Sequence, residues 1–420
     1  PLYSDNGCVL IVNGEIYNHR DIRESSRNYP WRTNGDGEAI LSAYESRSDS
    51  VDWLNRIDGI WGFALWDSKT EQLILSRDPL GVKPLIRTLT RDGTLLFGSE
   101  TKALRAHPQH TPELDEEALV ARLAFEYPLD DTTLLKDVHQ VRPGTAEIWV
   151  LNEEGAQLQS VTAYSREAVT PSEHWDVTQA PSLLETLTDS LADRLMSDVP
   201  LGIVLSGGLD SAMVAALAHE AAGRTGYPVP ACWTVAESED NPDWMAAQEV
   251  CKALDLEHHQ HILTEDAFSS ALPDLAWFGE DLDFTVLFFQ PLFKHMSQSV
   301  TVGLCGQGSD ELHAGYSRYQ NLSNHRTLIA SRLENCEHPF SNKLLNSTIQ
   351  QPGWTGVSHQ PTSVFSDLTS TLQYELDHGQ LTNFQLRLVD RHSMAHGLEV
   401  RVPFLGAAHR NAAHRLPLDW

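Results

Sequence analysis

The hexapeptide Ser206–Ser211, SGGLDS, carries the sharpest chemical signal in the sequence. It stands between an apolar run at 201–205 and a segment that is expected to be helical. Gly207 and Gly208 let backbone N–H groups close on an anion, and the positive end of a helix favours a phosphate there. No Gly-Lys-Ser/Thr follows, so this is not a Walker A loop, and Asp210 instead predicts a carboxylate that holds Mg²⁺ against a pyrophosphate. The alternative is a plain glycine-rich strand-to-helix turn.

A second acidic, glycine-rich turn, Cys305–Glu311, follows a strand-like run at 300–305. Ligands of open α/β sheets bind beyond the carboxyl ends of the strands, so the two turns are expected to face one site. Asp210 and Asp310 would then share one magnesium ion. Taken alone, the second turn reads more simply as a solvated turn.

The elements that must position these turns form two patterns along the chain. The first part is rich in strands, with one short helix expected at 37–47. Its strand-like runs lie at 7–18, 60–66, 72–77, 94–99 and 145–151. Asn13-Gly14 is a strong hairpin signal, and it predicts that the first strand ends there.

From about Thr170, after the polar stretch 152–176, strands and helices alternate. Strands are predicted at 201–205, 230–235 and 300–305, and helices at 181–196, 211–222 and 244–255. This alternation is typical of a doubly wound α/β domain. The last part, 320–420, is helical and polar, without an obvious repeat.

Composition excludes several classes of function. The 420 residues include 58 Asp and Glu against 30 Lys and Arg, and a net charge of -28 would repel nucleic acid. The longest apolar stretch, around 282–293, is shorter than the ~20 residues that a membrane span needs. Five cysteines without a paired spacing and no signal segment indicate a reducing, cytoplasmic location.

Seven stretches together resemble the asparagine synthetase family, and they occur in the family's order. They are NGEIYNH (13–19), RDPLGVKPL (77–85), FGSETKAL (97–104), DVPLGIVLSGGLDS (198–211), PDWMAAQEVCKALDLEHH (242–259), GQGSDELHAGY (306–316) and VDRHSMAHGLEVRVPFL (389–405). The resemblance implies an N-terminal class II glutamine amidotransferase domain, 1–165, an α/β/β/α sandwich of the N-terminal-nucleophile type. A doubly wound parallel α/β ATP-pyrophosphatase domain, 175–420, with a helical C-terminal part, would follow it.

The activity implied by the resemblance is amide synthesis in two parts. The first domain would hydrolyse glutamine to ammonia. The second would activate a carboxylate with MgATP as an acyl-adenylate, release pyrophosphate and form the amide. ATP and Mg²⁺ are therefore the expected cofactors, and glutamine and a carboxylic acid the expected small-molecule substrates; a homodimer fits the family.

Matching positions imply the site residues. The glutamine-binding and oxyanion positions are Asn13, Gly14, Glu15 and Asp36; the pyrophosphate loop is Ser206, Gly207, Gly208, Asp210 and Ser211; the AMP contacts are Val204, Val235, Cys305 and Gly306; and the second magnesium carboxylate is Asp310. Independently of the resemblance, an Asn amide beside a Gly N–H suits an oxyanion hole.

The two ends of the chain depart from the family's pattern. The family's N-terminal cysteine nucleophile is absent, because residue 1 is Pro and Cys8 falls inside a predicted strand. The natural protein is therefore expected to begin some tens of residues earlier. The family's adenylation lysine would follow Trp420, so no residue here is assigned to it.

A third departure is internal: Gln307 occupies the family's catalytic Glu position, where β-lactam and carbapenam synthetases carry Tyr. An amide cannot accept a proton at neutral pH, although it can donate a hydrogen bond to the adenylate. The proton would go to phosphate, water or a neighbour such as His313, or the acceptor differs from aspartate. Aromatic residues near 280–294 (Phe284, Phe288, Phe289 and Phe293) favour a larger acceptor, unless they are plain core.

Two further hypotheses stay open. One is an intramolecular amide-forming ligase of the β-lactam-synthetase or lasso-cyclase type without glutaminase activity, and the other is a non-catalytic homologue. The retained glutamine pocket speaks against the first, and the intact phosphate loop against the second. The cluster His258, His259 and His261 is interpreted as structural, because neighbouring strand residues face opposite ways.

Overall fold

The computed structural model describes residues 1–47, 50–165, 168–172, 174–281, 283, 287–346 and 359–418. The chain forms two compact units, Pro1–Ala168 with Ser317–Phe384, and Val169–Tyr316 with Gln385–Trp420. The predicted domains, 1–165 and 175–420, follow chain order, whereas segment 317–384 groups with the first unit. The assignment of functions to these stretches stays a prediction.

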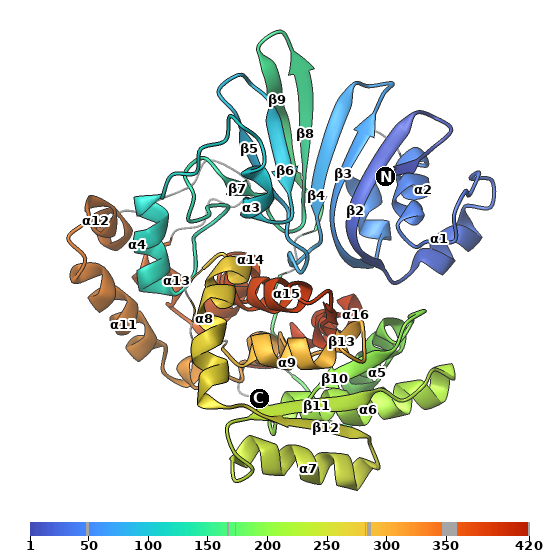
Figure 1. The fold of residues 1–420 in the computed structure, drawn as a ribbon, viewed down its shortest axis with the longest axis vertical. Coiled ribbons are helices and arrows are strands. Elements are labelled where there is room, and N and C mark those ends of the chain that lie inside the picture. The colour runs from blue at the N-terminus through green and yellow to red at the C-terminus, as the bar shows by residue number, and fades with distance from the viewer. Residues whose placement is uncertain are drawn as a thin grey trace. The chain divides into compact units, whose positions relative to one another are not determined.

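The first unit contains two stacked antiparallel sheets (Figure 1). The larger has the order β1 (Leu2–Tyr3), β2 (Cys8–Ile16), β3 (Gly59–Asp67), β4 (Gln72–Arg77), β8 (Thr145–Asn152) and β9 (Gly155–Ala163). The smaller has the order β6 (Leu95–Gly98), β5 (Ile86–Leu89) and β7 (His139–Gln140). Every strand pair in both sheets is antiparallel.

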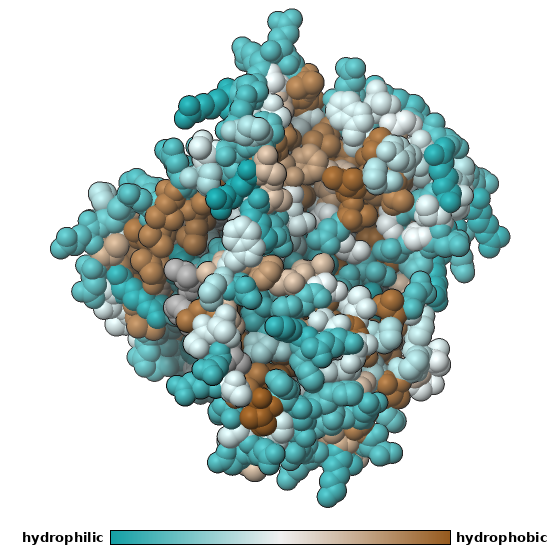
Figure 2. All heavy atoms as spheres, viewed as in Figure 1, coloured by the Kyte–Doolittle hydropathy of each residue, from teal (hydrophilic) through white to brown (hydrophobic). Residues whose placement is uncertain are grey.

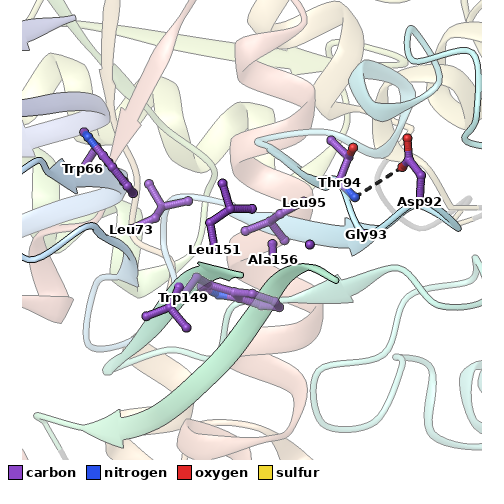
Figure 3. Close-up of a pocket in the computed structure, with 11 residues that line it drawn as sticks. Trp66, Leu73, Asp92, Gly93, Thr94, Leu95, Trp149, Leu151 and Ala156 are labelled. Atoms are coloured by element: carbon purple, nitrogen blue, oxygen red, sulfur yellow. Dashed lines mark hydrogen bonds between the residues drawn. The ribbon is translucent and has the colours of Figure 1, made fainter. Parts of the chain in front are cut away.

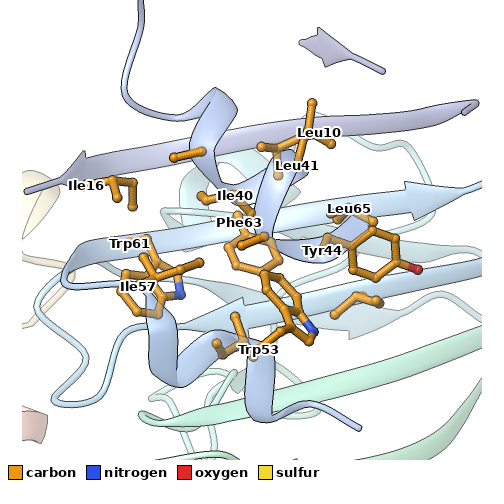
Figure 4. Close-up of a cluster of buried hydrophobic side chains, with 14 of the residues drawn as sticks. Leu10, Ile16, Ile40, Leu41, Tyr44, Trp53, Ile57, Trp61, Phe63 and Leu65 are labelled. Carbon is orange, nitrogen blue, oxygen red and sulfur yellow. The ribbon is translucent and has the colours of Figure 1, made fainter. Parts of the chain in front are cut away.

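Helices cover both outer faces of this pair of sheets. On one side α2 (Glu38–Glu45), preceded by α1 (His19–Ser25), packs Ile40, Leu41 and Tyr44 against β2 and β3 in a core of apolar side chains (Figure 4). On the other, Leu104 of α3 (Thr101–Leu104) packs against the smaller sheet. A third cluster, which includes Leu75 and Trp149, fills the space between the sheets. The predicted α/β/β/α sandwich is confirmed.

Segment 317–384 completes the first unit with helices. They are α11 (Leu322–Glu334), α12 (Pro339–Asn346), α13 (Pro361–Val364) and α14 (Leu368–Asp377), beside α4 (Glu116–Phe125) from the N-terminal part. The Arg332 guanidinium donates to the Ala124 carbonyl at 2.9 Å, and the buried His359 ring lies 2.8 Å from the Asp130 carboxylate. These contacts tie the late segment to the early one, a pairing that chain order alone does not indicate.

The second unit is built on a five-stranded parallel sheet. Its order is β12 (His258–Ile262), β11 (Ala231–Ala236), β10 (Leu201–Val204), β13 (Val302–Leu304) and β14 (Glu399–Arg401). The chain moves outward from β10 to β12 and then returns to the other side of β10. The strand order therefore reverses between β10 and β13, which is the switch point where α/β proteins bind ligands.

Helices lie on both faces of this sheet (Figure 1). They are α5 (Ala180–Arg194), α6 (Leu209–Thr225), α7 (Pro242–Leu254), α8 (Glu265–Gly279), α9 (Phe289–Met296), α10 (Ser309–His313), α15 (Leu386–Met394) and α16 (Ala407–Ala413). Phe293 and Met296 of α9 and Val389 of α15 pack on the sheet in one apolar cluster. The predicted doubly wound domain is confirmed.

One local prediction was wrong. Strand β2 does not turn at Asn13-Gly14 but continues to Ile16, with Gly14 paired to Trp61. A Cβ on Gly14 would lie 2.0 Å from the Ile60 carbonyl oxygen, so this glycine permits close approach of two strands instead of a turn. The polar stretch 152–176 contains β9, whose side chains are mostly exposed because it lies at a sheet edge.

The surface in Figure 2 is mainly hydrophilic, as the charge predicts. Apolar atoms gather over α4 and α11, where Leu123 and Leu328 are 66% and 49% exposed. Within the described residues, no helix has the length and apolar character to cross a membrane.

Candidate nucleotide and glutamine sites

The phosphate loop predicted at Ser206–Ser211 joins β10 to the N-terminus of α6. The Ser211 hydroxyl organises it: Ser211 Oγ accepts from the Ser206 N–H at 3.1 Å, and its single proton is shared between the Ser206 and Gly208 carbonyl oxygens, 2.9 and 3.1 Å away. Ser206 Oγ in turn accepts from the Gly208 N–H at 3.2 Å. Asp210 lies in the first turn of α6. The loop is therefore held in one shape beside a helix N-terminus, where an anion is favoured.

Gly207 has a packing reason as well as a chemical one. A Cβ there would lie 2.6 Å from Asp243 Cα and 2.8 Å from Ala246 Cβ, both in α7. The loop backbone thus rests directly on the start of α7, and any side chain would push it away.

The second loop lies against the first. A Cβ on Gly306 would lie 3.1 Å from both the Cβ and the carbonyl carbon of Asp210, and 3.1 Å from the Ser211 nitrogen. This contact follows from the sheet, because β10 and β13 are parallel neighbours with Ile203 beside Leu304. The sheet therefore brings together the two turns that were predicted to share a site.

Three predicted AMP contacts share one apolar cluster. Val204, Val235 and Cys305 come from the ends of three adjacent strands and pack with the side chains of α9. Burial raises the pKa of the Cys305 thiol to about 11, so it stays neutral and behaves as an apolar group. Apolar side chains beside a phosphate loop are suited to contact a nucleoside.

The predicted glutamine site lies in the first unit. Asn13, Gly14 and Glu15 are half-buried on β2, and the Asp36 carboxylate accepts from the Ile16 N–H at 2.7 Å. Asn13 Nδ2 donates to Ser99 Oγ at 3.3 Å. Ser99 was not among the predicted site residues, although it stands in the family-like stretch 97–104. Hydrogen bonds thus tie both Asp36 and Ser99 to β2, as a common pocket requires.

Comparison with known proteins decides the family. The "Asparagine synthase" family matches residues 182–420, and the "Glutamine amidotransferase domain" family matches residues 1–162. The chain belongs to the asparagine synthase family. The family predicted from the seven stretches is confirmed.

Curated relatives of the asparagine synthase family agree over much of the chain. Asparagine synthetase [glutamine-hydrolyzing] 1 of Bacillus subtilis is 26% identical, over 99% of this chain and 71% of that protein. Asparagine synthetase B [glutamine-hydrolyzing] of Escherichia coli is 31% identical, over 78% of this chain and 56% of that protein. A probable asparagine synthetase [glutamine-hydrolyzing] of Schizosaccharomyces pombe is 31% identical, over 76% and 56%.

The chain thus spans little more than half the length of the last two relatives. Among solved structures, glutamine phosphoribosylpyrophosphate amidotransferase of B. subtilis is 13% identical, with a TM-score of 0.27 over 79% of this chain and 61% of that chain. That score is too low to bear on the fold, which is described from its own sheets.

The donor set of this asparagine synthase family member suits magnesium. Among the described residues no group of three or more His, Cys, Asp or Glu side chains forms a metal site. Mg²⁺ is usually held by one or two carboxylates together with substrate phosphates, and Asp210 and Asp310 follow neighbouring parallel strands. Two oxygen ligands beside a phosphate loop therefore fit the ion.

Gln307 is held by a chain of hydrogen bonds that the sequence did not indicate. Gln307 Nε2 donates to Gln385 Oε1 at 2.5 Å, and Gln385 Nε2 donates to the Tyr316 hydroxyl at 3.3 Å. Tyr316 then donates to the buried Glu311 carboxylate at 3.1 Å. Residues 316 and 311 stand in the stretch 306–316, but Gln385 is remote in sequence and no motif pointed to it.

His313 is the neighbour proposed as a proton acceptor. Burial lowers its pKa from the ordinary range, although the hydrogen bond with the Ser309 carbonyl and the Asp210 charge oppose that shift. Its Nδ1 lies 3.0 Å from the Ser309 carbonyl, which can only accept, so Nδ1 carries the proton and Nε2 is the basic nitrogen.

The aromatic residues near 280–294 divide between core and surface. Phe293 is fully buried and stacks on Phe289 with ring centroids 5.3 Å apart, so these two are core. Phe288 is 43% exposed, and Phe284 lies outside the described residues. The expectation of a larger acceptor therefore depends on Gln307 rather than on these rings.

The three histidines of β12 have separate structural partners. His259 stacks on Trp233 at 4.4 Å, His258 lies 2.8 Å from Thr234 Oγ1, and His261 stacks on His295 at 4.9 Å.

A pocket in the first unit lies apart from the predicted glutamine residues (Figure 3). Trp66 and Trp149 line it with Leu73, Leu95 and Leu151, beneath the β5–β6 turn. None of the predicted site residues lines it.

Proposed function

We propose that this protein is a glutamine-dependent, ATP-consuming amide synthetase. A carboxylate attacks the α-phosphorus of ATP to give an acyl-adenylate and pyrophosphate, and ammonia then displaces AMP to give the amide and one proton. Ammonia would come from glutamine at the site around Asn13, Gly14, Glu15 and Asp36. The closeness of the two acidic loops carries the proposal: the Gly306 backbone lies against Asp210 and Ser211 at the switch point of the sheet.

Each part of this arrangement has a physical task. The loop fixed by Ser211 offers the pyrophosphate backbone N–H groups and the positive end of α6, a 17-residue helix. The cluster of Val204, Val235 and Cys305 offers the adenosine an apolar surface. Asp210 and Asp310 would hold Mg²⁺, which when bound neutralises charge on the departing pyrophosphate. Adenylation itself supplies the leaving group that a carboxylate lacks.

The glutamine half rests on separate contacts. An Asn amide and the Gly14 N–H can stabilise the oxyanion of glutamine hydrolysis, and a carboxylate such as Asp36 can fix a substrate ammonium. One oxygen of Asp36 accepts from the Ile16 N–H, which orients the group.

The acceptor is proposed to differ from aspartate. Gln307 supplies no base where the family has Glu, so an acceptor whose amidation needs a base at that position is a poor substrate. The same observation favours the second candidate, an intramolecular amide-forming ligase. The two are distinguished by whether turnover requires free ammonium.

The test is ATP–pyrophosphate exchange across a panel of carboxylic acids that includes aspartate. We expect exchange with at least one acid, and its loss in Asp210→Ala. The matched control is Asp189→Ala, which removes an exposed carboxylate of α5 and is expected to exchange normally. Loss of exchange in the control, or a wild-type rate in Asp210→Ala, contradicts the proposal. A homodimer and a cytoplasmic location stay predictions, and sedimentation tests the first.

A further inference from the structure

The hydrogen bonds from Gln307 to Glu311 have one direction. A carboxylate only accepts hydrogen bonds, so Tyr316 must donate to Glu311. The Tyr316 oxygen is then the acceptor for Gln385 Nε2, which turns Gln385 Oε1 toward Gln307. Gln307 must therefore present its nitrogen to Gln385. An amide that could otherwise lie either way round is fixed by a carboxylate three hydrogen bonds away.

This direction decides which end of Gln307 remains for a substrate. One N–H of Nε2 is used by Gln385, and among the described residues none donates a hydrogen bond to Gln307 Oε1. Gln307 is half-buried and directly follows Gly306, the residue that lies against the phosphate loop. Its carbonyl oxygen thus keeps its full capacity to accept hydrogen bonds, beside the one N–H of Nε2 that Gln385 does not use.

We infer that Gln385 and Tyr316 are positioning residues that turn the Gln307 amide so that Oε1 accepts an N–H from the attacking nitrogen. This inference rests on the proposed function. The nucleophile is ammonia or a primary amine, which has both a lone pair for the acyl carbon and N–H groups to donate. Gln307 keeps the hydrogen-bond-accepting ability of a carboxylate but not its ability to take the proton.

The arrangement changes the role expected for Gln307. From the sequence, its side chain could donate to the adenylate. Because Gln385 holds the nitrogen end of the amide, we expect the carbonyl oxygen to orient the incoming nitrogen. The proton released in amide formation then leaves to another acceptor, such as phosphate, water or a neighbouring side chain.

The variant that tests this is Gln385→Leu, which keeps the side-chain size and removes the acceptor for Gln307. A neutral hydrogen bond contributes about 1 kcal/mol, so the KM for ammonium should rise by about 5-fold. ATP–pyrophosphate exchange needs no nitrogen nucleophile and should keep its wild-type rate. Gln385→Glu still accepts from Gln307 and should largely restore the KM.

A control and a double variant separate positioning from folding. Gln248→Leu breaks a similar Gln–Gln hydrogen bond, of 3.2 Å to Gln260. It should change neither the KM for ammonium nor the rate of ATP–pyrophosphate exchange. In a Gln307→Leu background, Gln385→Leu should have no further effect on the KM for ammonium, because the residue through which it acts is gone.

The outcomes are distinct. If the wild type exchanges with no acid, the proposed function fails. If the wild type exchanges normally, two results with Gln385→Leu overturn the positioning inference. One is an unchanged KM for ammonium, and the other is an equal loss of exchange and amidation. An undiminished effect of Gln385→Leu in the Gln307→Leu background overturns it as well.

Discussion

Adding one methyl group at Gly306 should separate the two loops and slow adenylation. In Gly306→Ala the new Cβ would meet two atoms of Asp210 and the nitrogen of Ser211, all at 3.1 Å, whereas ordinary contacts lie at 3.4–4 Å. Most of these neighbours are backbone, so they cannot rotate away as the end of a flexible side chain would. The loops must therefore move apart by about 0.3 Å.

The size of the effect follows from that displacement. A misplacement of ~1 Å can cost about 100-fold in rate, so a displacement of about 0.3 Å predicts roughly a 4-fold slower ATP–pyrophosphate exchange. The backbone angle of Gly306 is not in the left-handed region, so alanine adds no conformational strain and the fold should persist. Initial exchange rates and a urea unfolding curve on the same preparation measure both quantities.

Gly303→Ala is the matched control for Gly306→Ala. It adds the same methyl group on β13, but the new atom would meet the flexible end of Met296 at 3.3 Å and Leu398 at 3.7 Å. We expect near-normal exchange there. A wild-type exchange rate in Gly306→Ala would refute the reasoning that the apposed loops form the site. So would an equal loss of exchange in both variants when both keep the stability of the wild type.

Three other predictions follow from individual contacts. Ser211→Ala removes the hydroxyl that binds the Ser206 and Gly208 carbonyls and should slow exchange about 10-fold, with urea unfolding as the check on folding. Asp36→Ala should weaken glutamine binding and destabilise the first unit by about 1–3 kcal/mol. Asp36→Asn can still accept from the Ile16 N–H, so it should keep the stability but not the glutamine binding. Calorimetry measures the binding and thermal unfolding measures the stability. Burial lowers the pKa of His409 to about 4, so below pH 6.5 the unfolded chain binds a proton that the folded chain does not. The free energy of unfolding should therefore fall by about 2 kcal/mol between pH 7 and pH 5 because of this residue alone. His409→Gln should reduce that pH dependence in urea unfolding, and an unchanged slope would contradict it.

The sequence predicted the parts of the fold that have strong local signals. The parallel strands 201–204, 231–236 and 302–304 are short apolar runs followed by glycine or helix, and their positions came within two residues. The prediction at Asn13-Gly14 was wrong because glycine suits a tight turn and also suits a strand that a neighbouring strand approaches closely. Only the position of the Ile60 carbonyl, which is a tertiary contact, distinguishes the turn from the strand.

Contacts that span long stretches of chain could not be predicted. Gln385 lies 78 positions after Gln307 in the chain, and neither residue type signals the other. Segment 317–384 packs with the first unit through contacts such as Arg332 to Ala124, which are tertiary and leave no periodic pattern. Local sequence therefore indicated the loops of the candidate site, while the residues that orient them required the structure.

The most direct test of the central claim is the identity of the nucleotide product. With an acid that supports exchange, Mg²⁺ and ammonium, we expect ATP to yield AMP and pyrophosphate in equal amounts with the amide, and Asp210→Ala to yield none. Formation of ADP and phosphate by the wild type would show that the loop at 206–211 directs a different cleavage, and would contradict the account.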